Sequence, residues 1–173
     1  MTHPDSTEPP ESPERATRVD LAYRRALIAF SATVLLAAVL GLLGVREAEA
    51  TASASGYELS VRHASVSRPG LATPFDVTVG RNEALPEEIV LEVSANYLAA
   101  FDENGLDPQP TRSFSDGERE RWLFEVPAGE HRLTVSFDAR LEPSVQWTRT
   151  ATVRLLVEGE EVTVVELRTW VMP

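Results

Sequence analysis

The feature that most constrains this chain is an apolar stretch at residues 26–45, which reads ALIAFSATVLLAAVLGLLGV. It contains neither a charged residue nor a proline, and Arg24, Arg25 and Arg46 flank it. A helix rises about 1.5 Å per residue, so the stretch reaches about 30 Å, the thickness of a bilayer's hydrocarbon core. Because buried helices of soluble proteins usually keep a polar stripe, we predict a transmembrane helix over residues 26–45.

A cleaved signal peptide is the main alternative for this segment. Residues 48–50 read AEA, the A-x-A form that a signal peptidase accepts, and Arg24 with Arg25 matches part of a twin-arginine signal. The apolar core of a signal peptide is typically about 7 to 15 residues long, so the length of this stretch favours an uncleaved anchor. Both outcomes place the C-terminal part of the chain outside the cytoplasm.

The arginines around the span predict its orientation. More of them precede the span than follow it: Arg15, Arg18, Arg24 and Arg25 before it, and Arg46 and Arg62 after it. The positive-inside rule therefore predicts a single-pass protein of the cell membrane, with a cytoplasmic N-terminus and an extracytoplasmic C-terminal domain.

The segments on either side of the span differ in composition. Residues 1–25 are rich in Pro, Ser, Thr and Glu, which predicts a disordered cytoplasmic tail. Residues 46–56 are small and polar, as in a flexible linker. Residues 57–173 remain as the extracytoplasmic domain.

From residue 57 onward, apolar and polar residues alternate in short runs. Turn sequences separate these runs, among them RPG at 68–70, NG at 104–105, DG at 116–117 and PAGE at 127–130. A period of two indicates half-buried strands, and the runs amount to about seven strands. We predict a mainly β domain, an antiparallel β-sandwich of about seven strands.

Residues 57–171 resemble the immunoglobulin-like and fibronectin-type-III-like β-sandwiches of extracytoplasmic proteins. The resemblance rests on the strand count and on turn-to-strand motifs such as VPAGEHRLTV at residues 126–135. It implies two antiparallel sheets packed face to face. The cysteine pair of antibody domains is absent from this sequence, so no functional residue is carried over from those families.

Composition excludes several classes of function. The chain has 27 acidic and 16 basic residues and a net charge of −11, which argues against nucleic-acid binding, because clustered cations supply the affinity for phosphates. It has no cysteine, so disulfides, thiolate metal sites and cysteine nucleophiles are excluded. Every basic residue is Arg and none is Lys, which is typical of a GC-rich, bacterial genome.

No catalytic or metal-binding pattern stands out. His63 and His131 lie in ordinary strand and turn contexts, without a G-x-S-x-G or H-E-x-x-H motif. The acidic residues near position 105 have the chemistry of a calcium site but not EF-hand spacing, and paired glutamates elsewhere fit solvated strand edges. We therefore expect a protein that is not an enzyme and that holds no cofactor or metal.

Two features exceed what a minimal sandwich needs, so we single them out for partner binding. Trp170 shares a strand face with Arg168 and is either an exposed binding residue or a cap over a sheet edge. The long connection at residues 98–118 contains either a short edge strand near residues 112–114 or an interaction element. The candidate partner-binding residues are Trp170, Arg168, Asp102, Asn104 and Asp107.

Small residues recur every four positions in the apolar segment. Ala29, Thr33, Ala37 and Gly41 would form one face on which a second helix can approach closely. Alanine is abundant throughout the chain, so chance is an equally good explanation of the spacing.

These observations lead to one expected function and one alternative. The expected function is a membrane-anchored extracytoplasmic β-sandwich that binds or scaffolds a membrane or envelope protein. The alternative is a module that binds cell-wall glycan or calcium.

Overall fold

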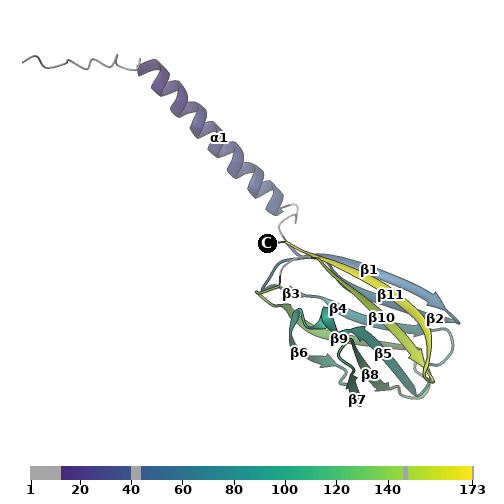
Figure 1. The fold of residues 1–173 in the computed structure, drawn as a ribbon. Coiled ribbons are helices and arrows are strands. Elements are labelled where there is room, and N and C mark those ends of the chain that lie inside the picture. The colour runs from purple at the N-terminus through teal and green to yellow at the C-terminus, as the bar shows by residue number, and fades with distance from the viewer. Residues whose placement is uncertain (1–12, 40–43, 146–147, 173) are drawn as a thin grey trace, which may run out of the picture. The chain divides into compact units, whose positions relative to one another are not determined.

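The structure, a computed structural model, describes residues 13–39, 44–145 and 148–172. The chain divides into two compact units, Met1–Leu43 and Gly44–Pro173. Figure 1 shows helix α1 in the first unit and a β-rich second unit.

The first unit contains helix α1, Pro13–Val39. Its residues Asp20–Val39 are long and apolar enough to cross a membrane and none of them is buried, properties that an N-terminal signal sequence shares. Residues 13–25, expected to be disordered, are therefore helical in the structure. Proline is well tolerated at the first helical position, so Pro13 does not oppose this start. Residues 1–12 of the expected tail and residues 40–43 of the expected span lie outside the described residues.

The second unit is mainly β, as predicted. Its elements are β1 Arg46–Ala54, β2 Tyr57–Ser67, β3 Ala72–Thr73, β4 Phe75–Arg81, β5 Glu88–Ser94, α2 Ala95–Leu98, β6 Phe101–Asp107, β7 Arg112–Ser115, β8 Arg119–Glu125, β9 Arg132–Leu141, β10 Arg149–Val157 and β11 Glu160–Val171.

The described residues form 11 strands, more than the seven or so that we expected. Residues 46–54 of the expected flexible linker form β1, which pairs along its whole length with β2. The long connection at residues 98–118 contains β6 and β7, so the edge strand expected near residues 112–114 is present. Trp147, which follows Val145 at the spacing of a strand and is expected in the core, lies outside the described residues.

The described strands belong to one mixed sheet. Its order is β3-β9-β4-β2-β11-β10-β5-β8-β7, with β1 added to β2 and β6 added to β9. Every pairing is antiparallel except a short parallel one, in which Trp170 and Val171 of β11 lie beside Val66 and Ser67 of β2. The expected all-antiparallel arrangement is therefore interrupted at this junction.

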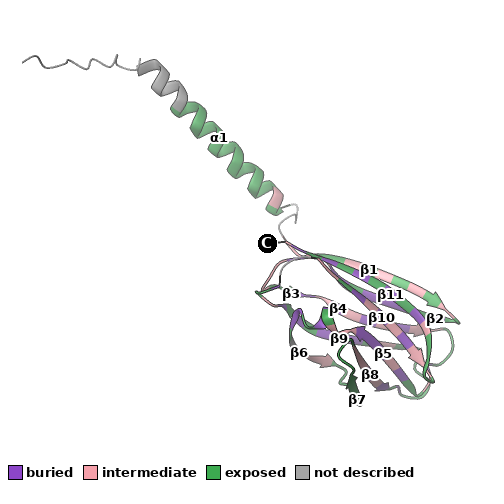
Figure 2. Ribbon diagram, in the orientation of Figure 1, coloured by how far each residue is buried: buried purple, intermediate pink, exposed green. Residues whose placement is uncertain are grey.

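The sheet curls over one hydrophobic core. Trp122 of β8 and Phe137 of β9 come from strands near opposite ends of the strand order, yet their ring centroids are 6.3 Å apart. Phe137 also contacts Phe75 of β4, with ring centroids 6.1 Å apart. Figure 2 shows buried and exposed residues alternating along the strands, as a sheet with one covered face requires.

A buried hydrogen-bonded group closes the junction between β2 and β11. The hydroxyl of Thr169 donates its only proton to the carbonyl of Ala64 at 2.7 Å. Because that proton is used, the hydroxyl of Tyr97 is the donor in its 2.9 Å hydrogen bond to Thr169. Burial raises the pKa of Tyr97 to about 12. These bonds satisfy polar groups that the curled sheet would otherwise leave unpaired inside it.

Candidate interaction surface

One solvent-facing side of the sheet combines charged and apolar residues. It is formed by β7, β8, β5, β10 and β11, and we call it the β5 face. Its residues are Val90, Glu92, Ser94, Arg112, Phe114, Arg119, Arg121, Leu123, Thr150, Thr152, Arg154, Leu156, Val164, Glu166, Arg168 and Trp170. Their neighbours in sequence, such as Leu91 and Trp122, point into the core.

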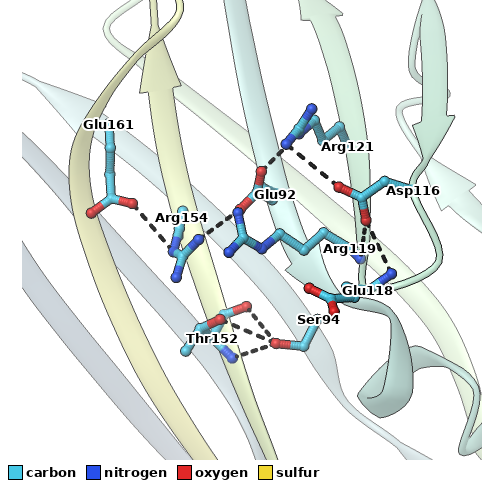
Figure 3. Close-up of polar contacts among 9 residues, drawn as sticks. All are labelled: Glu92, Ser94, Asp116, Glu118, Arg119, Arg121, Thr152, Arg154 and Glu161. Atoms are coloured by element: carbon cyan, nitrogen blue, oxygen red, sulfur yellow. Dashed lines mark hydrogen bonds and ion pairs between the residues drawn. The ribbon is translucent and has the colours of Figure 1, made fainter.

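The centre of the β5 face holds a buried carboxylate. Glu92 is only 3% exposed, although it lies on the solvent side of β5. Nε of Arg121 donates to Glu92 Oε2 at 2.7 Å, and Nη1 of Arg154 donates to Oε1 at 2.9 Å (Figure 3). Nη1 of Arg119 lies 3.2 Å from the same Oε1. Guanidinium groups from two neighbouring strands therefore enclose this carboxylate.

Further carboxylates pair with the outer sides of these arginines. Oδ2 of Asp116 lies 3.6 Å from Nη2 of Arg121, and Oε2 of Glu161 lies 3.2 Å from Nε of Arg154. The second contact is an ion pair rather than a hydrogen bond. The cluster therefore extends over four strands, β5, β8, β10 and β11, and the turn that holds Asp116, and its contacts position the guanidinium groups.

The environment of Glu92 changes its acidity in two opposing ways. Burial raises the pKa of its carboxyl, while the hydrogen bonds of Arg121 and Arg154 and the charges of Arg119 and Arg121 lower it. The net direction is downward from the ordinary value. Glu92 is therefore ionised near neutral pH and holds the arginines electrostatically.

An apolar row lies beside the charged cluster. Leu123 of β8, Val90 of β5 and Leu156 of β10 are direct cross-strand neighbours. They are half-buried and do not belong to the hydrophobic core. Phe114 at one margin of the β5 face and Val164 at the other are 56% and 39% exposed. This face therefore offers aliphatic and aromatic surface to the solvent.

The solvent-facing side of β1, β2, β4 and β9 is polar. We call it the β4 face, and its central residues are Glu47, Glu49, Thr51, Ser60, Arg62, Asp76, Thr78, Thr134 and Ser136. Nε of Arg62 donates to Asp76 at 2.8 Å, and the hydroxyls of Thr78 and Thr134 lie 3.1 Å apart. The β4 face has the composition of an ordinary solvated surface, which the β5 face does not.

Two of the residues that we singled out from the sequence lie on the β5 face. Trp170 and Arg168 are exposed on β11, and Trp170 is 55% exposed. Arg168 also lines a shallow groove of about 530 Å³ with Ser94, Thr152 and Glu166.

The other predicted partner-binding residues lie elsewhere. Asp102, Asn104 and Asp107 are in β6, which pairs with β9, so they are not on the β5 face. Asp102 and Asp107 are exposed. Among the described residues, no group of three or more His, Asp or Glu side chains is arranged to hold a metal ion.

Three of the four small residues that recur every four positions belong to α1. Ala29, Thr33 and Ala37 recur along α1, and the hydroxyl of Thr33 donates to the carbonyl of Ala29 at 2.9 Å. This bond satisfies the Thr33 hydroxyl within its own helix. Gly41 lies outside the described residues.

The alternation of apolar and polar residues alone does not predict the β5 face, although the sequence carries a signal for it. Apolar triplets interrupt the alternation at residues 89–91, 122–124 and 155–157. Such triplets indicate strands with apolar residues on both sides, and the middle residue of each is the one on the β5 face.

Comparisons with known proteins add little to this description. No protein-family model and no curated protein matches the chain. Among solved structures, the chain is similar to the Pseudomonas fluorescens alkylpurine DNA glycosylase AlkC bound to DNA containing an abasic site analog, with 14% identity and a TM-score of 0.29. The similarity covers 61% of this chain and 28% of that chain. A TM-score this low indicates neither a shared fold nor a shared function.

Proposed function

We propose that this chain is a single-pass membrane-anchored protein whose extracytoplasmic β domain, an Ig-like sandwich in overall character, binds a membrane or envelope protein through the β5 face. The N-terminus is cytoplasmic in this proposal, and α1 is an uncleaved anchor. The proposal rests mainly on the difference between the two solvent-facing sides of the sheet. The β4 face is polar, whereas the β5 face combines apolar residues with paired charges.

Solvation alone does not explain this contrast. Contiguous apolar patches on a protein surface often mark interaction sites. The β5 face has an apolar row, exposed aromatic residues at its margins, and arginines held by a buried carboxylate. Aromatic residues and arginine are enriched at the energetic centres of protein interfaces. The anchor would keep such a face near membrane-bound partners.

Site-specific photocrosslinking tests the binding proposal in membranes of the native cell. A photoreactive residue replaces Leu123 on the β5 face or, as a matched control, Thr78 on the β4 face. We expect one crosslinked membrane or envelope protein, identified by mass spectrometry, from position 123 and not from position 78. Equal crosslinking from both positions, or crosslinking to glycan instead of protein, contradicts the proposal.

The anchor is tested by the N-terminal sequence of the mature protein and by protease added to spheroplasts. We expect an intact N-terminus and degradation of the β domain from outside. A mature chain that begins at Thr51 contradicts the uncleaved anchor.

A further inference from the structure

The end of the β unit at which β1 begins carries a group of arginines. We call it the Arg46 end, and it consists of residues 44–46, 66–72, 98–102, 140–145, 149 and 169–172. Val66 is the pairing partner of both Arg46 and Trp170, and the N–H of Gly70 donates to the carbonyl of Leu141 at 2.7 Å. Figure 1 shows the start of β1 and the end of β11 together at this end. Its arginines are Arg46, Arg68, Arg140 and Arg149.

These four arginines differ from those in the middle of the sheet in having no protein partner. The arginines that make ion pairs are Arg62, Arg81, Arg119, Arg121 and Arg154. Among the described residues, no side chain forms an ion pair with an arginine of the Arg46 end. The Nε atoms of Arg68 and Arg149 are buried without a hydrogen-bond partner. The positive charge of this end is therefore not neutralised within the described part of the chain.

Charge is distributed unevenly between the two ends of the β unit. The acidic residues of the Arg46 end are Asp102 and Glu142. Glu118 lies further along the sheet, where its carbonyl accepts from the N–H of Ala95 at 2.9 Å. The opposite end, which includes the turn between β10 and β11, carries Glu58, Glu83, Glu88, Glu130, Glu158 and Glu160 against Arg81 and Arg132. An anionic surface would therefore attract the Arg46 end and repel the opposite end.

Exposed apolar side chains accompany these arginines. Trp170 is 55% exposed and Leu71 is 39% exposed. The carbonyl of Leu71 accepts from the N–H of Leu141, the residue after Arg140, at 3.1 Å. Tryptophan is enriched where hydrocarbon meets water in membrane proteins, because its ring is apolar and its N–H is polar. Trp170 is also the last residue of the β5 face in this direction, so the two surfaces are continuous.

The sequence brings the Arg46 end directly after the proposed anchor. The apolar segment ends at residue 45, and β1 begins at Arg46. Consecutive Cα atoms are about 3.8 Å apart and neighbouring strands about 5 Å apart. An anchor in the membrane therefore holds the segments that pair with the start of β1 within reach of the lipid headgroups.

We propose that the Arg46 end rests on the outer surface of the membrane, with its arginines on the phosphates of anionic lipids and Trp170 and Leu71 at headgroup level. Guanidinium groups bind phosphate through paired hydrogen bonds. The attraction decays within a Debye length, about 10 Å at 0.1 M salt, so arginines at the surface dominate it. The strands then lead away from the membrane, and the β5 face is presented sideways to a membrane-bound partner. The inference rests on the proposed function, because α1 must span the membrane to bring this end to the lipid.

A dye at a single cysteine tests the docking on the full chain in nanodiscs, since the chain has no cysteine of its own. The labelled positions are Ser144→Cys at the Arg46 end and, as the matched control, Ala84→Cys at the opposite end, and both residues are exposed. A nitroxide on the lipid headgroups quenches a dye that lies close to them. The nanodiscs contain phosphatidylcholine alone or in equal parts with phosphatidylglycerol.

We expect at least threefold stronger quenching at position 144 than at position 84 in the nanodiscs with phosphatidylglycerol. This ratio should fall in phosphatidylcholine alone and at high salt, because the attraction is electrostatic. Equal quenching at the two positions overturns the docking. A ratio that is the same in both lipids overturns the assignment of anionic headgroups as the binding partner.

Arginine variants test which residues bind the lipid. Arg46→Gln combined with Arg140→Gln removes two exposed charges from the Arg46 end. It should lower the ratio of docked to undocked domain about tenfold, and quenching at position 144 with it. Arg112→Gln combined with Arg132→Gln is the matched control, since it removes two exposed arginines that lie elsewhere, and it should keep the parent's quenching. Parent-like quenching in the first pair, or an equal loss in both pairs, contradicts the inference.

Failure of this inference and failure of the proposed function give different results. A chain that does not enter the nanodiscs overturns the anchor and the docking together. Entry with equal quenching at positions 144 and 84 overturns the docking and leaves the position-123 crosslink as support for the β5 face. The expected quenching without a crosslink from position 123 supports the docking and overturns the protein partner.

Discussion

At the residue scale, Glu92 shows how a sheet surface accommodates a buried charge. An isolated carboxylate taken out of water loses several kcal/mol of solvation, and only close, well-oriented partners compensate for this loss. Arg119 and Arg121 of β8 and Arg154 of β10 provide those partners from both sides of β5. The order of this cluster holds the arginines in a defined arrangement on the β5 face.

Glu92→Gln should destabilise the β domain by about 2 kcal/mol at neutral pH, between the cost of breaking an exposed ion pair and that of breaking a buried one. The pKa of Glu92 is lower in the folded state than its ordinary value of 4.5. Its contribution is therefore present above that value and is lost as the pH falls through the folded-state pKa. Urea unfolding of residues 44–173 at about pH 7 and about pH 3 measures the effect.

The free energies of unfolding of the parent and of Glu92→Gln should differ most at neutral pH and become similar in acid. Asp116 also has a lowered pKa, through the backbone hydrogen bonds of Arg119 and Glu118, so the parent's own pH dependence contains more than one group. The difference between parent and variant isolates Glu92. A difference that stays constant with pH contradicts this assignment.

Alternation along β5 places Glu92 on the solvent side, and the structure confirms that side. Its burial was beyond prediction, because it depends on the register of β8 and β10 against β5. A shift of one residue in either pairing would turn Arg121 or Arg154 to the core side. The sequence therefore predicts which side of the sheet a residue faces better than it predicts which residues of the neighbouring strands that residue contacts.

At the element scale, β1 shows why a strand can resemble a linker. Ala48, Ala50, Ala52 and Ala54 occur at every second position and are half-buried, with polar residues between them. The period of a strand is present in the sequence, but alanine has low β-propensity and buries little area by itself. Pairing with β2 along nine residues supplies the stability that the local sequence lacks.

Ala50→Asp should destabilise the β domain by about 2 kcal/mol, because it places an unpaired carboxylate against the core. Thr51→Asp is the matched control, since Thr51 is exposed on the β4 face, and its effect should stay within about 0.5 kcal/mol. Urea midpoints of the two variants of residues 44–173 measure the difference. Equal small effects would indicate that β1 does not pack on the core in solution.

At the scale of the whole molecule, the two units bury their side chains very differently. The core residues all belong to the β unit, whereas the described apolar side chains of α1, such as Leu27, Phe30 and Leu35, are exposed. A hydrophobic core that is complete within one unit predicts independent folding of that unit. The exposed apolar surface of α1 is consistent with the membrane anchor that we propose.

The position of the domain boundary is the final prediction, because the sequence indicates residue 57 and the structure indicates residue 44. Residues 44–173 should give a soluble, β-rich monomer by circular dichroism and gel filtration. Residues 57–173 lack β1, so the edge of β2 and the core beneath Ala50 and Ala52 become exposed. This shorter chain should melt lower, by roughly 4 °C for each kcal/mol lost, and should elute as larger species. Equal melting temperatures and monomeric elution of both chains would show that β1 is a dispensable linker after all.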